Sequence, residues 1–340
     1  MSHSIDTPAD AAIYQHPLAY LLGLQGVALL RAFAGEYDRE FTEARLTEIR
    51  TLLDSADQLG KGGTAGPIAT ADGYDGWAEY YDRPGNAMID REQPFVREIL
   101  DGLPVGVALD AACGTGRHTA YLTSLGHKVI GVDSSPGMLT KARLKVPAAE
   151  FHEGDLHHLP IPDDHVDVVL CGLALEHVPD LAPVFAEFVR VLRPGGHLVI
   201  SDSRGLLPGA RRYPMIKGGP DGKSGSVQSW VHSTSDYLKA ALPLNLQVRS
   251  CEEPPRPEPL VDETGTPPGG DEPIARYVAS DNLPGIWALH PWAPTATNAA
   301  YRGVPHFIVW HFQLGNLIHR RQVDRTSLAS AQAPTTERAQ

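Results

Sequence analysis

Short apolar runs alternate with amphipathic segments through the middle of the chain, between about residues 105 and 203. Such runs of four to eight apolar residues are typical of buried strands, and helical patterns lie between them. Strands that alternate with helices predict an α/β fold with a doubly wound sheet. The five predicted strands lie at 105–112, 129–132, 151–156, 166–173 and 197–202. Two further apolar runs, 246–252 and 306–312, predict two more strands.

The region before this alternating pattern predicts helices. Residues 17–34 are apolar nearly all round, which indicates a buried helix, and residues 42–54 place their apolar side chains on one face. We expect the two helices to form a cap on the sheet domain. The alternative is a homodimer that forms through the apolar side chains of 18–33. Residues 59–71 are rich in glycine and threonine and predict a flexible loop.

The segment 105–133 combines a strand, a glycine turn, a helix and a second strand that ends in an acid. Gly114 and Gly116 leave room for a ligand to approach the backbone, because they carry no side chain. The carboxylate of Asp133 can accept hydrogen bonds from both hydroxyls of a ribose. The dinucleotide fingerprint requires a third small residue, but Thr119 stands at that position. The turn also follows Asp110, an acid that disfavours a pyrophosphate and favours a cationic ligand.

Together, Asp-Ala-Ala-Cys-Gly-Thr-Gly at 110–116 and the acid Asp133 resemble the class I S-adenosylmethionine-dependent methyltransferases. Leu-Arg-Pro-Gly-Gly at 192–196, followed by an apolar strand, is similar to a frequent signature of that family. The resemblance implies a Rossmann-like, mostly parallel seven-stranded sheet whose last two strands form an antiparallel pair. It also implies S-adenosyl-L-methionine as cofactor and S-adenosyl-L-homocysteine as product.

The resemblance further implies which residues hold the cofactor. The glycine turn holds the methionine part, Asp133 holds the ribose, and Asp155 in Gly-Asp-Leu binds the exocyclic amine of the adenine. An aromatic segment before the sheet domain is similar to the part that many small-molecule methyltransferases fold over the cofactor. The expected cofactor-binding residues are Tyr74, Tyr81, Asp110, Ala112, Gly114, Gly116, Asp133, Ser134, Met138, Asp155, Leu156 and Leu173.

Two residues after the fourth predicted strand are candidates for a general base. The family presents the transferred methyl at this strand end, where the sequence has Glu176 and His177. Histidine has an unperturbed pKa close to neutrality, which suits it to remove a proton from an acceptor.

The acceptor is expected to be a small molecule, of the kind found in secondary metabolism. Cations after the fifth strand and aromatic residues in the insertion are the candidates to bind it. These residues are Arg204, Arg211, Arg212, Trp230, Trp287, His290, Trp292 and Tyr301. If the cations bind a diphosphate, the chain would resemble an isoprenoid diphosphate C-methyltransferase that uses Glu176 as base and Mg²⁺ as a second cofactor. Otherwise we predict no metal, because no ligand spacing is evident.

The composition and the spacing of the glycines argue against two other functions. The net charge of −12 argues against a nucleic-acid substrate, and the missing third glycine argues against a nicotinamide-dependent oxidoreductase. A cofactor-bound cyclase or scaffold that transfers no methyl group remains an alternative. The three cysteines suit the reducing cytoplasm, where we expect the protein, and we expect neither a signal peptide nor a membrane partner.

The chain divides into five expected segments. They are an N-terminal helical extension and loop (1–72), a methyltransferase core (73–253), an insertion that caps the substrate (254–305), the last core strand (306–316) and a disordered tail (317–340).

Overall fold

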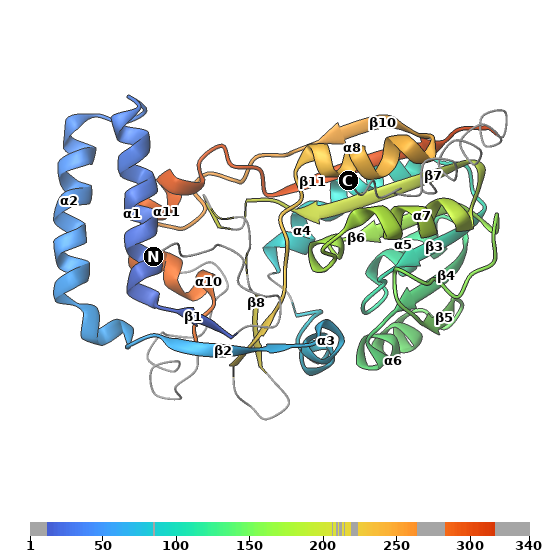
Figure 1. Cartoon of the computed structure of the whole chain (residues 1–340), viewed down its shortest axis with the longest axis horizontal. Coiled ribbons are helices and arrows are strands. Elements are labelled where there is room, and N and C mark those ends of the chain that lie inside the picture. Colours follow the sequence, from blue (N-terminus) through green and yellow to red (C-terminus); the bar gives the residue numbers. More distant parts are fainter. Residues whose placement is uncertain are drawn as a thin grey trace, which may run out of the picture.

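A seven-stranded sheet forms the core of the larger part of the molecule, on the right in Figure 1. The computed structural model describes residues 12–83, 86–205, 207–208, 210, 213, 215–218, 224–263 and 283–316. The strands lie in the order β10 (Leu246–Glu252), β11 (Phe307–Leu314), β7 (Leu192–Ser203), β6 (Val166–Gly172), β3 (Val107–Ala111), β4 (Lys128–Asp133) and β5 (Glu150–Glu153).

The five strands from β7 to β5 run parallel, whereas β11 is antiparallel to both β7 and β10. The predicted doubly wound, mostly parallel seven-stranded sheet is therefore confirmed. Along the chain, β3 is followed by β4 and β5 on one side, and β6 and β7 then continue on the other side. The order reverses between β3 and β6, and ligands of open α/β sheets bind at the carboxyl ends of the strands at such a point.

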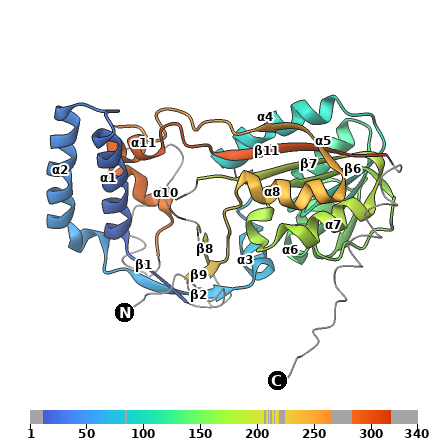
Figure 2. The ribbon, with the colours of Figure 1, turned by 45° about the horizontal axis from the view of Figure 1, so that its top comes forward.

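Helices cover both faces of the sheet, and alternate strand residues supply the two cores. Ala108, Val129 and Val168 pack with α4 (Ala87–Asp101) and α5 (Arg117–Ser124). Their neighbours Leu109, Ile130 and Val169 join the opposite core with α7 (Leu181–Val191) and α8 (Thr234–Ala241). Figure 2 shows these helices around the sheet. The short segments η2 (Leu175–His177), η3 (Leu242–Leu244) and α6 (Pro136–Lys145) complete this part of the molecule.

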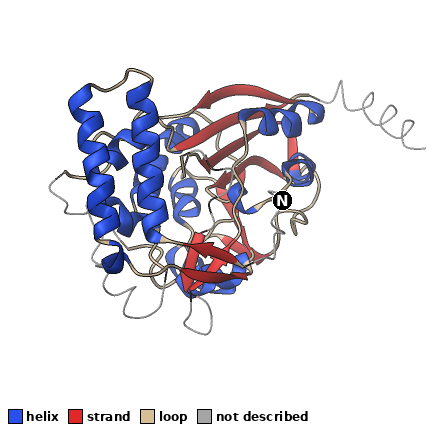
Figure 3. Cartoon of the chain, turned by 60° about the vertical axis from the view of Figure 1, so that its left-hand side comes forward, coloured by secondary structure: helices blue, strands red, loops and turns tan. Residues whose placement is uncertain are grey.

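A second unit consists of helices, which Figure 3 shows beside the sheets. The sequence colours of Figure 1 show that these helices come from both ends of the described chain. The antiparallel helices α1 (Pro17–Phe33) and α2 (Arg39–Asp54) contact each other, and α1 also packs against α11 (Pro294–Tyr301). Their shared core contains Leu21, Leu24, Leu52, Ala296 and Ala300. The helical cap and the insertion that we treated as separate segments thus share one core. The segments η1 (Ala56–Leu59), α10 (Ile286–Leu289) and η4 (His290–Trp292) lie beside them.

The prediction that α1 is buried all round is wrong. Leu21 and Leu24 are buried, but Leu30 is 70% exposed and Phe33 is 93% exposed. In Figure 1, α1 lies between the outermost helix α2 and α11, and it is covered where it faces these neighbours, whereas its last turns leave Leu30 and Phe33 exposed.

The prediction of a flexible loop at 59–71 is also wrong. Its residues form β2 (Gly63–Ile68) and the beginning of α3 (Thr70–Trp77). A second sheet joins β1 (Ile13–Gln15), β2, β9 (Ser224–Val227) and β8 (Met215–Gly218) in that order. The glycine-rich strand β2 is ordered by pairing with β1 and β9, which are distant in sequence. Among the described residues, no helix combines the length and apolar character that crossing a bilayer requires.

Candidate active site

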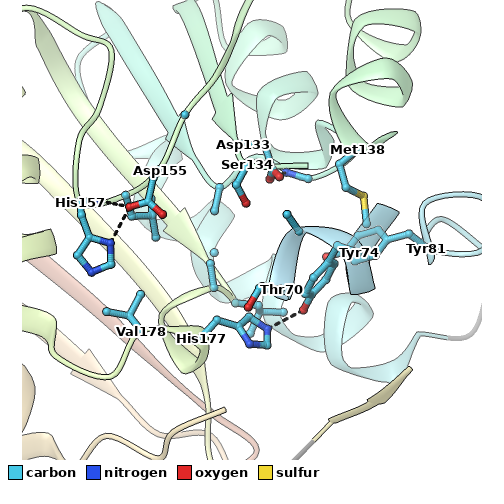
Figure 4. Close-up of a pocket in the computed structure, with 18 residues that line it drawn as sticks. Thr70, Tyr74, Tyr81, Asp133, Ser134, Met138, Asp155, His157, His177 and Val178 are labelled. Carbon is cyan, nitrogen blue, oxygen red and sulfur yellow. Dashed lines mark hydrogen bonds and ion pairs between the residues drawn. The ribbon is translucent and has the colours of Figure 1, made fainter. Parts of the chain in front are cut away.

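A pocket opens at the carboxyl ends of β3, β4, β5 and β6, where the sheet order reverses (Figure 4). Helix α3 forms the opposite wall. The lining residues are Thr70, Ala71, Tyr74, Tyr81, Ala112, Gly114, Asp133, Ser134, Met138, Gly154, Asp155, Leu156, His157, Gly172, Leu173, Ala174, His177 and Val178. The structure therefore brings together ten of the twelve residues expected to hold a cofactor, together with His177.

The backbone at the ends of β3 and β6 has an unusual conformation. Ala112 and Leu173 both have a positive φ, 58° and 55°, which costs a residue with a side chain about 1–3 kcal/mol. Gly114 has a φ of 54°, and a Cβ atom added to it would meet no atom within 4 Å. This glycine therefore leaves open space in the pocket at the first turn.

Asp133 joins two segments of the pocket through its carboxylate. Oδ2 accepts a hydrogen bond from the backbone N–H of Gly114 at 2.7 Å, and Oδ1 accepts one from Ser135 N–H at 2.9 Å. Burial raises the pKa of Asp133, and these two backbone donors oppose that rise. A carboxylate has about four acceptor positions, so Asp133 retains positions for two donors from a ligand.

Helix α3 is fastened over the pocket by Asp75. Its carboxylate accepts hydrogen bonds from the Ser135 hydroxyl and from Gly137 N–H, the latter at 2.8 Å. Both donors lie at the N-terminus of α6, where Ser135 also caps the helix by accepting from Met138 N–H. Tyr74 and Tyr81 project from this side into the pocket, as Figure 4 shows.

Another acid, Asp155, lies beyond the end of β5 at the other end of the pocket. Its Oδ1 accepts hydrogen bonds from the backbone N–H and the ring Nδ1 of His157, at 2.7 and 2.6 Å. Although burial opposes it, this pairing lowers the pKa of Asp155. Leu156 and the buried Met138 supply apolar surface in the same pocket.

His177 is held between two oxygen atoms. Its Nδ1 lies 2.8 Å from the backbone carbonyl of Gln228, and its Nε2 lies 2.9 Å from the Tyr74 hydroxyl (Figure 4). A carbonyl only accepts, so Nδ1 carries the proton and donates to Gln228. In the neutral ring Nε2 is then an acceptor on the pocket side, as a general base requires.

Glu176 lies behind His177 and does not line the pocket. It is 6% exposed and accepts a hydrogen bond from the Ser203 hydroxyl at 2.5 Å, and its Oε1 is 3.9 Å from His177 Nε2. The neighbouring Asp202 is buried at the end of β7 and accepts from the backbone N–H of Glu176 at 3.0 Å. Burial, and then the charge of Glu176, raise the pKa of Asp202 to about 7.

Asp110 and Gly116 lie just outside the lining. Asp110 is 1% exposed and accepts a hydrogen bond from the Thr119 hydroxyl at 2.6 Å. This bond explains why threonine occupies the place of the third glycine. Gly116 has a φ of 82°, and an added Cβ would lie 3.2 Å from Ala142, so it allows α5 to begin close to α6.

The residues expected to bind the acceptor are not gathered at this pocket. Arg204 donates to the carbonyl of His232 and to Thr234, and it forms an ion pair with Glu253. The backbone N–H of Trp230 donates to the carbonyl of Glu176. The other described candidates lie in the helical unit, at Trp287, His290, Trp292 and Tyr301. Arg211 and Arg212 lie outside the described residues.

Those helical candidates are held by α1. The Tyr20 hydroxyl lies 2.8 Å from His290 Nε2 and 3.1 Å from the Tyr301 hydroxyl. Trp292 packs against the core of the helical unit, and Trp287 is 46% exposed. None of these four lines the pocket at the strand ends.

Sequence reasoning did not identify several residues of the pocket, namely Thr70, Ala71, Gly154, His157, Gly172, Ala174 and Val178. His157 follows Asp155 by two residues, so an Asp-x-His pattern after a strand is a signal that could have found it. Thr70 and Ala71 gave no local signal, because their place depends on how α3 docks onto α6.

The chain is similar to known methyltransferases. Residues 109–200 match a family model described as a methyltransferase domain. A malonyl-[acyl-carrier protein] O-methyltransferase from Yersinia pestis is 38% identical over 125 residues, 36% of this chain and 46% of that protein. A demethylmenaquinone methyltransferase from Chlorobaculum parvum is 42% identical over 122 residues, 36% of this chain and 48% of that protein.

The chain thus spans less than half the length of each of these two relatives. Among solved structures, an S-adenosylmethionine-dependent methyltransferase from Mesorhizobium loti aligns with 65% of this chain and 97% of its own. The identity is 23% and the TM-score is 0.44.

Proposed function

We propose that this chain, whose residues 109–200 match a methyltransferase domain, transfers a methyl group from S-adenosylmethionine to a small-molecule acceptor. The single observation that carries the proposal is the pocket in which the Asp133 carboxylate and the open glycine turn lie opposite His177. The proposal covers the activity of the whole chain, whereas the family match covers residues 109–200.

The residues of the pocket fit the cofactor. Asp133 has free acceptor positions for the two ribose hydroxyls, and Gly114 leaves open space for the chain that carries the sulfur. Asp155 offers a second oxygen to the adenine amine, between the apolar side chains of Met138 and Leu156. When bound, S-adenosylmethionine supplies an electrophilic methyl group on a positively charged sulfur, and the acids of the pocket suit that charge.

We assign His177 as the general base. Because Nδ1 donates to the Gln228 carbonyl, Nε2 carries the lone pair of the neutral ring and is the atom that would accept the proton from the acceptor. The Tyr74 hydroxyl at Nε2 orients the ring and occupies the place where an acceptor hydroxyl would bond. Glu176 would act through its neighbours, since its carboxylate is directed to Ser203.

The base assignment is tested by measuring the methyl-transfer rate of the His177→Gln variant. The acceptors are a panel of small molecules with a hydroxyl, an amine or an acidic C–H group. Loss of a positioned general base lowers the rate by about 10²- to 10⁴-fold, so we expect a loss of that size with cofactor affinity unchanged. Radiolabelled methyl transfer measures turnover, and titration calorimetry with S-adenosylhomocysteine measures affinity.

Glu79→Gln is the control, because this exposed acid pairs with Lys141 away from the pocket lining. If His177→Gln turns over at the wild-type rate, the base assignment is wrong. If the wild-type protein does not bind S-adenosylhomocysteine, the proposed function is wrong.

The diphosphate alternative gains no support from the described residues. Arg204, its first cation, is already paired with Glu253, and Mg²⁺ would be needed only for that substrate. A role in secondary metabolism, a cytoplasmic location and a homodimer through the N-terminal helices stay predictions.

A further inference from the structure

Arg256 is a buried cation without an acidic partner. Its side chain is 3% exposed, and it forms no ion pair with any carboxylate of the described residues. Nη2 donates to the backbone carbonyls of Arg204 and Gly205, at 3.1 and 3.0 Å. Nε and Nη1 are buried and make no hydrogen bond, so three of the five N–H donors are unsatisfied.

Leaving a buried charge unpaired is costly, and buried charges in proteins are normally paired or bound to a ligand. Burial lowers the pKa of Arg256 to about 10, so the group still carries its charge at neutral pH. Its guanidinium is fixed by two carbonyls and lies 4.7 Å from the centre of the Tyr301 ring. Arg256 is therefore a charged donor held in one orientation.

Two more groups with unsatisfied donors lie near Arg256. His306 is 1% exposed, and neither of its ring nitrogens makes a hydrogen bond. Burial, then the charges of Arg256 and Arg91, lower its pKa to about 3, so it is neutral. Arg91 on α4 also has a buried Nη1 without a partner. The ionisable groups whose charges shift the pKa of Arg256 are Tyr301, Tyr20 and Arg91. None of these groups is a carboxylate.

The cluster lies at the same edge of the sheet as the cofactor pocket. His306 precedes β11, and its carbonyl accepts a hydrogen bond from Arg204 N–H, directly after β7. This edge faces the helical unit, because β11 begins shortly after α11 (Figure 1). The cluster therefore lies where the helical unit meets the carboxyl ends of the strands.

Tyr213 connects this cluster with the catalytic side. It is buried and packs in one apolar cluster with Tyr20, whose hydroxyl lies 3.1 Å from that of Tyr301. Its carbonyl accepts a hydrogen bond from the Ser229 hydroxyl, and the next residue, Trp230, donates its backbone N–H to the Glu176 carbonyl. Tyr213 is thus linked to neighbours of both Arg256 and His177.

We propose that Arg256, assisted by Arg91 and His306, binds a carboxylate of the acceptor. This inference rests on the proposed function, and it deepens that function by naming the acceptor as an acid. The unsatisfied N–H donors of the fixed Arg256 guanidinium match the two oxygens of a carboxylate, and the tyrosines Tyr20, Tyr213 and Tyr301 suit an apolar or aromatic body.

The test uses the full chain saturated with S-adenosylhomocysteine and the probes benzoate, benzamide and inorganic phosphate. Benzamide has the shape of benzoate without its charge. We expect benzoate, but not benzamide, to bind and to raise the Tm of the wild-type protein. A hydrogen bond to a charged group is strong enough that Arg256→Gln should weaken benzoate about 10- to 100-fold.

Arg204→Gln is the matched control, since this neighbouring cation is already paired with Glu253, and its benzoate response should persist. Arg256→Lys keeps the charge but has fewer fixed donors, so it should retain part of the benzoate response. It replaces Arg256→Gln as the test if the glutamine variant does not fold. The carboxylate site is disproved if the wild type ignores benzoate, if Arg256→Gln responds as the wild type does, or if only phosphate binds. Calorimetry with S-adenosylhomocysteine alone is read separately, so failure of cofactor binding would count against the proposed function and not against Arg256.

Discussion

Asp133 connects the turn after β3 with the beginning of α6, and it is the residue on which we expect cofactor binding to depend most. Asp133→Asn keeps an oxygen for one backbone donor but removes the charge and one acceptor oxygen. Because hydrogen bonds to a charged group contribute about 1.5–3 kcal/mol, the affinity for S-adenosylhomocysteine should fall about 10- to 100-fold. Titration calorimetry measures it.

The control for this substitution is Asp163→Asn. Asp163 is an exposed acid that pairs with Arg190, away from the pocket lining, so cofactor affinity should not change. An unchanged affinity in Asp133→Asn would mean that the ribose is not bound by this carboxylate.

The raised pKa of Asp202 leads to a prediction of how the stability of the protein depends on pH. Its pKa rises from 3.8 to about 7 on folding, so between these values the folded state binds more protons than the unfolded state. Its contribution to the free energy of unfolding is therefore lost as the pH rises from about 4 to 7. Asp202→Asn removes this titration, and its Oδ1 can still accept from the backbone N–H groups of Glu176 and Ser203.

Urea unfolding of wild type and Asp202→Asn at several pH values checks this. The variant should gain stability relative to the wild type as the pH approaches 7. Parallel pH profiles of the two proteins would show that Asp202 does not titrate in this range.

Among single residues, the sequence predicted those whose role depends on a strand end. Asp133 and Gly114 come at the ends of apolar runs, Asp155 was given by the resemblance of Gly-Asp-Leu, and all three line the pocket. Arg256 has no such marker, because it lies in a proline-rich segment, and its place depends on contacts with Tyr301 and with residues after β7. Whether the predicted site residues bind as proposed stays for the variants to test.

At the scale of elements, α3 closes the pocket and depends on Asp75. Asp75→Ala removes the acceptor for the Ser135 hydroxyl and for Gly137 N–H. We expect α3 to open more often, so that the backbone amides within Thr70–Trp77 exchange faster with solvent. The KM for S-adenosylmethionine should rise about 5- to 20-fold. This rise corresponds to roughly 1–2 kcal/mol, the free energy of the lost surface hydrogen bonds.

Glu79→Ala provides the comparison, because its ion pair with Lys141 also joins this region to α6 but is exposed on the Glu79 side. Exposed ion pairs contribute little, so this variant should stay close to the wild type. Equal exchange rates in Asp75→Ala and wild type would show that the carboxylate does not hold α3.

The alternating strands and helices of the central sheet could be predicted because each element carries its own periodic pattern. The small sheet could not, because its strands are short and contain glycines, and β2 is paired with residues about 160 positions away in β9. The helices α10 and α11 were recognised only as an aromatic stretch near the acceptor. Their apolar residues face α1, and the sequence gives no local sign of that partner.

At the scale of the whole molecule, the described residues form a sheet that carries the pocket and a helical unit. Arg256, which pairs with no acid in the described parts of the chain, lies where the two meet. The strand pattern predicted the doubly wound sheet, and the family resemblance implied its seven strands and antiparallel last pair. The contact region between the sheet and the helical unit could not be predicted, because the segments that form it are distant in sequence. Helix α1 packs against α11, and the residue after β7 bonds to the residue before β11. We expect that contact region to determine which acceptors the enzyme takes.

The position of β11 has a consequence for biosynthesis. Both the edge strand β10 and the parallel strand β7 pair with β11, and α1 packs against α11, which immediately precedes β11 in the chain. On the ribosome, β10 therefore has no partner and α1 lacks part of its core until almost all of the described chain has been made. Such a high contact order slows folding, and it leaves apolar surfaces open to chaperones during translation.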